Sequence, residues 1–111
     1  MFKKLDDGVS VSPQISTTDL RLIAAAGFKS IICNRPDGES ADQTPYAVIE
    51  AGALEAGLPI RNVPVVSGAI TEDNVRDMKA ALAELPKPVY AYCRSGARSA
   101  NLYMLVQQTP D

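Results

Sequence analysis

The sequence contains no histidine and no tryptophan, and only 2 of its 111 residues are cysteine. The lack of histidine excludes a Cys–His or Ser–His catalytic pair within the chain. It also argues against a zinc site, since such sites are usually built from histidine or from several cysteines. Any reactive group in this protein must therefore be activated in another way.

Long hydrophobic runs and clusters of one charge are also absent. No apolar stretch approaches the ~20 residues that span a bilayer, and the Lys and Arg residues form no basic run of the kind that binds nucleic acid. Met1–Leu5 carries the positive charge of a signal peptide, but Asp6, Asp7 and Gly8 follow in place of an apolar core. We therefore expect a cytoplasmic protein that binds neither nucleic acid nor membranes.

The composition is that of an ordinary globular protein, with 46% hydrophobic and 22% charged residues and a formal net charge of -2. A chain of this length can build one hydrophobic core, so a single domain over residues 1–111 is predicted. The two cysteines, Cys33 and Cys93, indicate reactivity more than a stabilising disulfide, because the chain has no secretory features.

Short apolar segments alternate with amphipathic ones along the chain, after a polar lead-in at residues 2–8. The predicted strands cover residues 9–15, 28–34, 58–65 and 89–92. The predicted helices cover residues 16–26, 45–56, 71–85 and 97–107. This alternation predicts an α/β fold with three layers, α/β/α, around a central, mainly parallel four-stranded sheet. Ligands of such folds bind beyond the carboxyl ends of the strands.

The segment from Val89 to Ser99 carries the strongest chemical signal. It reads as an apolar strand, a loop from Cys93 to Arg98 and the start of a helix. The backbone N–H groups of such a loop and of a helix N-terminus favour anions. They can lower the pKa of a thiol from ~8.5 to roughly 3.5–7.5, which makes Cys93 a candidate nucleophile.

The other residues of this loop fit a site for an anion. Arg98 can bind two anion oxygens with its guanidinium group, and Gly96 permits a positive φ or a close backbone approach. The predicted substrate-binding residues are Arg94, Ser95, Gly96, Ala97, Ser99 and, from another loop, Arg35. The alternative is an inert buried cysteine with solvated arginines. The combination of Cys93, Gly96 and Arg98 in a strand–loop–helix context favours the functional interpretation.

Cys93-Arg94-Ser95-Gly96-Ala97-Arg98-Ser99 resembles the active-site loop of single-domain rhodaneses, in which four residues separate Cys and Arg. It also resembles the cysteine-dependent protein phosphatases, in which five residues separate them. The whole chain resembles the beta-lactamase-hydrolase-like N-terminal domain family of bacteria. The matching segments are Ile15-Ser16, residues 27–32, residues 34–39, Pro64-Val65 and residues 92–99.

This resemblance implies a dual-specificity-phosphatase-like fold with rhodanese-like chemistry. Some family members are fused to a sulfur dioxygenase domain, which makes a separate sulfur dioxygenase a candidate partner. The resemblance further implies that the shorter loop belongs with sulfane sulfur. Two departures from the phosphatases agree: residues 63–70 contain no carboxylate to act as general acid, and Tyr92 stands where phosphatases usually have histidine.

The sequence therefore predicts a sulfurtransferase. Cys93 would take sulfane sulfur from thiosulfate or a persulfide and pass it to a thiol or cyanide acceptor, while Arg98 binds the anionic donor and Ser99 tunes the thiolate. No metal or organic cofactor is needed. One alternative is a cysteine-dependent phosphatase acting through a Cys93 phosphocysteine, with Asp37 or Glu39 as replacement acid. The other is a persulfide carrier or redox sensor without turnover.

Three further residues are auxiliary candidates. Cys33 ends a strand expected to neighbour the Cys93 strand, and is either a resolving cysteine or, as we prefer, a small core residue. Asn34 and Asp37 begin the predicted loop at residues 34–44. In that loop Arg35 is expected either to bind substrate anions or to pair with Asp37 and brace the loop.

Overall fold

The computed structural model describes residues 2–110, which form a sheet between two pairs of helices. The strands are β1 (Lys3–Lys4), β2 (Val9–Ser12), β3 (Ser30–Cys33), β4 (Ile60–Asn62) and β5 (Val89–Tyr92). The helices are α1 (Asp19–Ala25), α2 (Tyr46–Glu55), α3 (Glu72–Glu84) and α4 (Ala97–Gln108). The strand order is β1-β2-β5-β3-β4, with β2, β5, β3 and β4 parallel.

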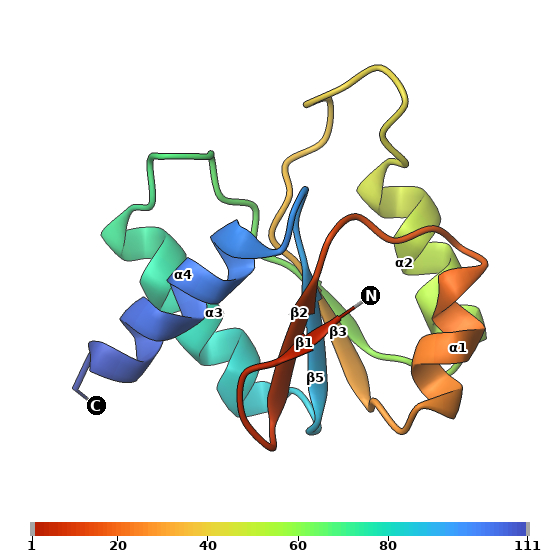
Figure 1. Cartoon of the computed structure of the whole chain (residues 1–111), viewed down its shortest axis with the longest axis horizontal. Coiled ribbons are helices and arrows are strands. Elements are labelled where there is room, and N and C mark those ends of the chain that lie inside the picture. The colour runs from red at the N-terminus through yellow and green to blue at the C-terminus, as the bar shows by residue number, and fades with distance from the viewer. Residues whose placement is uncertain (1, 111) are drawn as a thin grey trace.

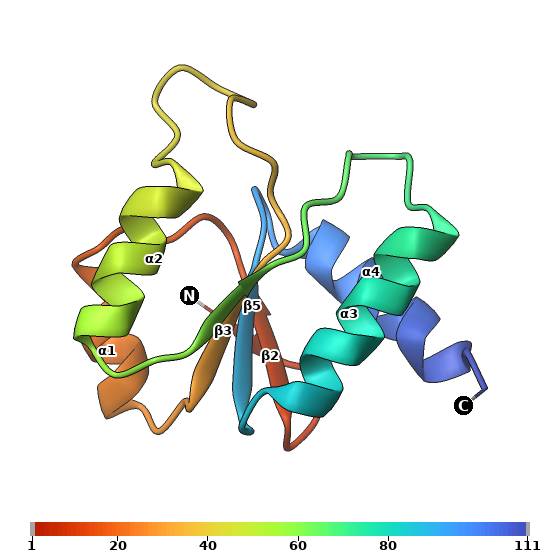
Figure 2. The ribbon, with the colours of Figure 1, turned by 180° about the vertical axis from the view of Figure 1, so that it is seen from behind.

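The helices cover both faces of the sheet, α1 and α2 on one and α3 and α4 on the other (Figures 1 and 2). Since successive residues of a strand point to opposite faces, β5 contributes to both cores. Tyr90 and Tyr92 pack with α1 and α2, whereas Val89 and Ala91 pack with α3 and α4. The predicted three-layer α/β/α architecture is confirmed.

The sheet has one strand more than the sequence predicted. β1 lies within the expected polar lead-in and pairs antiparallel with β2, Lys3 opposite Val11 and Lys4 opposite Ser10. The chain reverses between them where the Asp6 carboxylate accepts hydrogen bonds from the N–H groups of Gly8 and Val9, at 2.8 and 2.9 Å. Two exposed lysines carry no hydrophobic alternation, so the sequence gives no sign of this edge strand.

Several element boundaries also differ from prediction, and two of these differences have a clear physical cause. β4 is shorter than the predicted residues 58–65, because Pro59 and Pro64 flank it and a proline has no N–H for the ladder. α1 begins at Asp19 and not at residue 16 as predicted, with Thr18 as its N-cap residue. The Asp19 carboxylate accepts a hydrogen bond from Ser16 N–H at 2.9 Å.

Three loops converge at the carboxyl ends of the parallel strands (Figure 1). They are residues 34–45 after β3, residues 63–71 after β4 and residues 93–96 after β5. β5 lies between β2 and β3, so the loop that follows it emerges from the middle of the sheet. Among residues 2–110, no helix has the length and apolar character needed to cross a membrane.

Candidate active site

The Cys93 loop turns sharply between the end of β5 at Tyr92 and the start of α4 at Ala97. Gly96 makes this turn with a φ of 95°. A Cβ at this position would lie 3.3 Å from the carbonyl carbon of Ser12 on β2, so glycine is required for both conformation and space. The turn aims Gly96 N–H at Cys93 Sγ, 3.0 Å away.

The Cys93 thiol is fully buried but disposed to ionise. Burial alone would raise its pKa. The N–H group and hydroxyl of Ser99 and the N–H group of Gly96 favour the thiolate more strongly, with a contribution from Ser95 N–H, so the pKa of Cys93 lies below its ordinary value. This is the condition for a nucleophilic cysteine that has no histidine partner.

Ser99 lies on the first turn of α4 and is fully buried. Its hydroxyl has no hydrogen bond of good geometry among the described residues, although it lies close enough to the thiol to favour ionisation. The Ser99 hydroxyl can therefore donate to Cys93 once the sulfur is charged. That Ser99 tunes the thiolate during the reaction stays a prediction.

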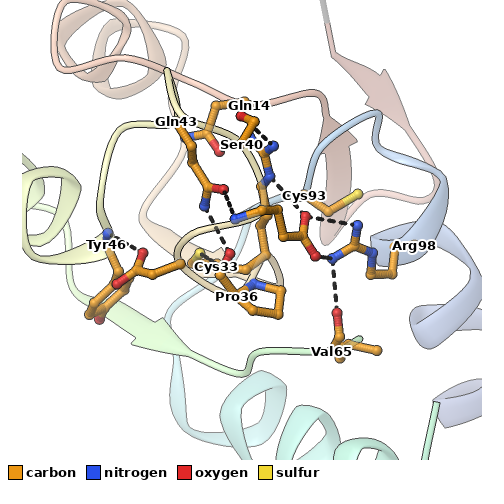
Figure 3. A network of polar contacts seen from close by, with 12 residues as sticks. Gln14, Cys33, Pro36, Ser40, Gln43, Tyr46, Val65, Cys93 and Arg98 are labelled. Atoms are coloured by element: carbon orange, nitrogen blue, oxygen red, sulfur yellow. Dashed lines mark hydrogen bonds and ion pairs between the residues drawn. The ribbon is translucent and has the colours of Figure 1, made fainter. Parts of the chain in front are cut away.

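Arg98 is held by groups from two other loops. Its Nη1 donates to Glu39 Oε2 and to the Val65 carbonyl oxygen, both at 2.9 Å, and its Nη2 donates to Glu39 Oε1 at 3.2 Å. Its Nε is buried and has no partner among the described residues. Figure 3 shows Arg98 joined to this network beside Cys93. The guanidinium group is thus fixed at one edge, and its Nε–H remains available.

Arg35 is buried on the other side of Glu39. Its Nε donates to Glu39 Oε1 at 3.0 Å, its Nη1 to Gln14 Oε1 at 3.1 Å and its Nη2 to Ser40 Oγ at 3.3 Å. It does not pair with Asp37, as one sequence-based interpretation had it. Asp37 Oδ1 instead accepts a hydrogen bond from Tyr46 N–H at 2.8 Å, at the start of α2. The Arg35–Asp37 pair was a wrong prediction because the intervening turn directs Asp37 toward the helix.

Glu39 therefore links the two arginines. The Arg98 hydrogen bonds, followed by those of Arg35, outweigh burial and hold the pKa of Glu39 below its usual range. An ionised carboxylate has no proton to give, so this arrangement does not suit the replacement general acid considered above. Sequence reasoning missed Glu39 as the partner of Arg98, and the only available signal was its place in the polar segment that follows β3.

Asn34 and Cys33 lie below the site. Asn34 Nδ2 donates to the Val63 carbonyl oxygen at 3.0 Å and so joins the ends of β3 and β4. Cys33 donates its S–H to the Arg35 carbonyl oxygen at 3.3 Å, and burial raises the pKa of its thiol. Both cysteines are free. These contacts favour the interpretation of Cys33 as a small core residue.

A cavity of about 440 Å³ opens beside the Cys93 loop. Arg94 and Ser95 are exposed there, which places the second arginine at the rim as expected. No carboxylate lines the cavity among the described residues. The lining residues are Ser67, Gly68, Ile70, Arg94, Ser95, Ala97, Arg98 and Asn101. Asn101 was missed from sequence, although it lies one helical turn after Arg98.

A cysteine of lowered pKa after a central strand, a glycine turn and an arginine on the following helix are the arrangement of a cysteine-dependent, phosphatase-like α/β/α fold family. The chain belongs to the family of the beta-lactamase hydrolase-like protein, phosphatase-like domain, whose model matches residues 1–109. The family resemblance noted from the sequence is thereby confirmed.

Individual relatives agree with this assignment. The chain is 34% identical over 102 residues to the beta-lactamase hydrolase-like protein of Agrobacterium fabrum, covering 92% of this chain and 24% of the relative. It thus spans about a quarter of that relative's length. A crystal structure from Neisseria meningitidis, described as a "putative phosphatase", has 34% identity and a TM-score of 0.86, covering 97% of this chain and 79% of that one.

A more distant neighbour shows the fold alone. The core catalytic domain of the PP-IP phosphatase SIW14 from S. cerevisiae has a TM-score of 0.73 at 15% identity, covering 96% of this chain and 64% of that one. The dual-specificity-phosphatase-like fold that the sequence predicted is therefore confirmed. The predicted sulfurtransferase activity receives no support from these relatives, which favour the phosphatase alternative.

Proposed function

We propose that this protein is a cysteine-dependent phosphatase that acts on a phosphate monoester through Cys93. One observation carries the proposal: the Cys93 thiol has a lowered pKa inside a loop of N–H donors that leads directly to Arg98. A thiolate, backbone donors and an arginine are what phosphoryl transfer through a cysteine requires. The family match and the Neisseria structure support the same reaction class.

The reaction has two steps. The Cys93 thiolate attacks phosphorus, an S–P bond forms, and the P–O bond to the leaving group breaks. The leaving oxygen keeps the electron pair and takes a proton from solvent, since no carboxylate lines the cavity among the described residues. Water then attacks phosphorus, the S–P bond breaks, and inorganic phosphate and the Cys93 thiolate are released. Arg98 and the loop N–H groups stabilise the charge on the transferred group.

Sulfur transfer is the second candidate, because two observations favour it. The loop holds four residues between Cys93 and Arg98, and no acid is placed to protonate a poor leaving group. The Cys93 thiolate would attack the outer sulfur of thiosulfate, and sulfite would leave with the electrons of the broken S–S bond. A thiol acceptor would then take the outer sulfur and restore the thiolate. Sulfite needs no protonation on leaving, so this route would work without an acid.

Mass spectrometry of Cys93 separates the two candidates. The protein is mixed with p-nitrophenyl phosphate or with thiosulfate, quenched in acid and digested, with Cys93→Ser and Cys33→Ser as matched controls. A phosphoryl group on Cys93, together with release of p-nitrophenol that Cys33→Ser retains, supports the phosphatase. One added sulfur with turnover to cyanide, and no phosphoryl group, overturns it in favour of sulfur transfer. A persulfide without turnover indicates a sulfur carrier.

A further inference from the structure

Glu39 is placed where it controls the geometry of Arg98. It lies in the loop after β3, and its two carboxylate oxygens accept hydrogen bonds from both terminal nitrogens of Arg98. The same carboxylate accepts from Arg35 Nε at 3.0 Å. The side chains of Arg35, Glu39 and Arg98 are 4%, 21% and 10% exposed, so this chain of charges is largely shielded from water.

The Arg98 guanidinium group is not saturated by these contacts. Of its five N–H groups, three donate to Glu39 and to the Val65 carbonyl oxygen. The remaining two are Nε–H and one N–H of Nη2, which share one edge of the planar group. The buried Nε has no partner among the described residues. Glu39 therefore occupies one edge and leaves free a second edge that can bind two oxygens of an anion.

We propose that Glu39 is the positioning residue of the Cys93 site. It fixes the guanidinium group of Arg98 so that the Nε–Nη2 edge meets an oxyanion held by the Cys93 loop. Arg35 in turn fixes Glu39, since its other two nitrogens are bound by Gln14 and Ser40. This inference rests on the proposed function, because it assumes that Arg98 binds the oxyanion that Cys93 attacks.

The loop can keep its shape without the Glu39 side chain. The backbone N–H of Glu39 donates to Gln43 Oε1 at 3.0 Å, and Gln43 Nε2 donates to the Pro36 carbonyl oxygen at 2.9 Å (Figure 3). Asp37 anchors the same loop to α2. Substitutions of Glu39 should therefore disturb Arg98 more than they disturb the backbone of the loop.

Tungstate provides a test that does not depend on turnover. It is an unreactive oxyanion, and binding at the Cys93 loop should protect Cys93 from iodoacetamide, so a series of tungstate concentrations yields its Kd. The variants are Glu39→Ala and Glu39→Gln, and the matched control is Glu55→Gln, an exposed carboxylate on α2. Melting temperatures check folding, and the alkylation rate without tungstate reports whether the thiol itself has changed.

We expect Glu39→Ala to raise the Kd of tungstate about tenfold, because a misaligned arginine loses its paired hydrogen bonds. Glu39→Gln should raise it about threefold, since one amide oxygen remains to accept, and Glu55→Gln should leave it unchanged. An unchanged or lower Kd in folded Glu39→Ala overturns the proposal, and a lower one shows that Glu39 competes with the anion. If Glu39→Ala does not fold, Glu39→Gln decides in the same way. If tungstate fails to protect the wild-type Cys93, the proposed function fails, and this inference fails with it.

Discussion

Cys33 ends β3, and Cys93 directly follows the neighbouring parallel strand β5, since the register places Cys33 opposite Tyr92. Both thiols are buried and free, yet their pKa values move in opposite directions. After β3 the thiol of Cys33 meets a carbonyl oxygen, to which it donates. After β5 the glycine turn presents N–H groups, from which the sulfur of Cys93 accepts. The few residues that follow each strand, more than burial, decide whether the cysteine is inert or reactive.

Replacing Cys93 or Cys33 with serine should give the largest difference in enzymatic activity between the ends of β5 and β3. Cys93→Ser should lower turnover of p-nitrophenyl phosphate by at least ~10³-fold, because a serine hydroxyl without a base is a poor nucleophile. Cys33→Ser should retain activity within about threefold, since the thiol only fills the core and donates to a carbonyl. Steady-state kinetics of the two purified variants measure this, and comparable losses in both would break the distinction.

Replacing Arg98 or Arg35 with lysine should give a smaller difference in activity. Arg98→Lys keeps the charge but loses the paired N–H groups, so kcat/KM should fall by about 10²-fold. Arg35→Lys should lower kcat/KM by about tenfold, because Arg35 acts on the anion only through Glu39. Kinetics should be accompanied by melting curves, and Arg76→Lys, on the exposed face of α3, serves as the inert control.

Gly96 in the Cys93 loop and Gly38 in the loop after β3 allow their backbone strain to be compared. Gly96→Ala should lower the free energy of unfolding by roughly 2 kcal/mol, since a positive φ combines with a close approach to the Ser12 backbone. Gly38→Ala, with a φ of 79° and no atom within 4 Å of the added Cβ, should cost about 1 kcal/mol. Urea denaturation measures both values. Only Gly96→Ala should also raise the pKa of Cys93, and a shift in both variants would contradict the role of the Gly96 N–H group.

The alkylation rates of the two thiols should differ in their pH dependence. Because the pKa of Cys93 is lowered, its reaction with iodoacetamide should rise with pH around a midpoint below that of an ordinary thiol, while Cys33 should react with a midpoint above it. The same shifts act on stability. Cys93 contributes stability that is present above its unfolded pKa and lost as pH falls through its folded pKa. Cys33 contributes stability that is present below its unfolded pKa and lost as pH rises through its folded pKa. Identical midpoints for the two thiols would refute the contrast.

The parts of the site that follow local rules were predictable from sequence. The apolar run before Cys93 predicted the strand, Gly96 predicted the turn, and the amphipathic segment that includes Arg98 predicted the helix. Together they located the thiol. The partner of Arg98 was not predictable, because Glu39 reaches it only when two loops from different strands meet above the sheet. β1 was missed because Lys3 and Lys4 show no alternation of apolar and polar residues. The preference for sulfur over phosphate rested on the length of the Cys93 loop, on the lack of a carboxylate in residues 63–70 and on Tyr92, and none of these features fixes which atom the loop binds.

The sheet order also has a consequence for the way the chain is made. β2 and β3 do not pair with each other, and both pair with β5, which follows them in the chain and leaves the ribosome after them. Chains that have not yet supplied β5 have an incomplete sheet, and the turn that lowers the pKa of Cys93 follows that strand. The Cys93 thiol therefore becomes a nucleophile only after β5 and the start of α4 have been synthesised and the core around the sheet has closed.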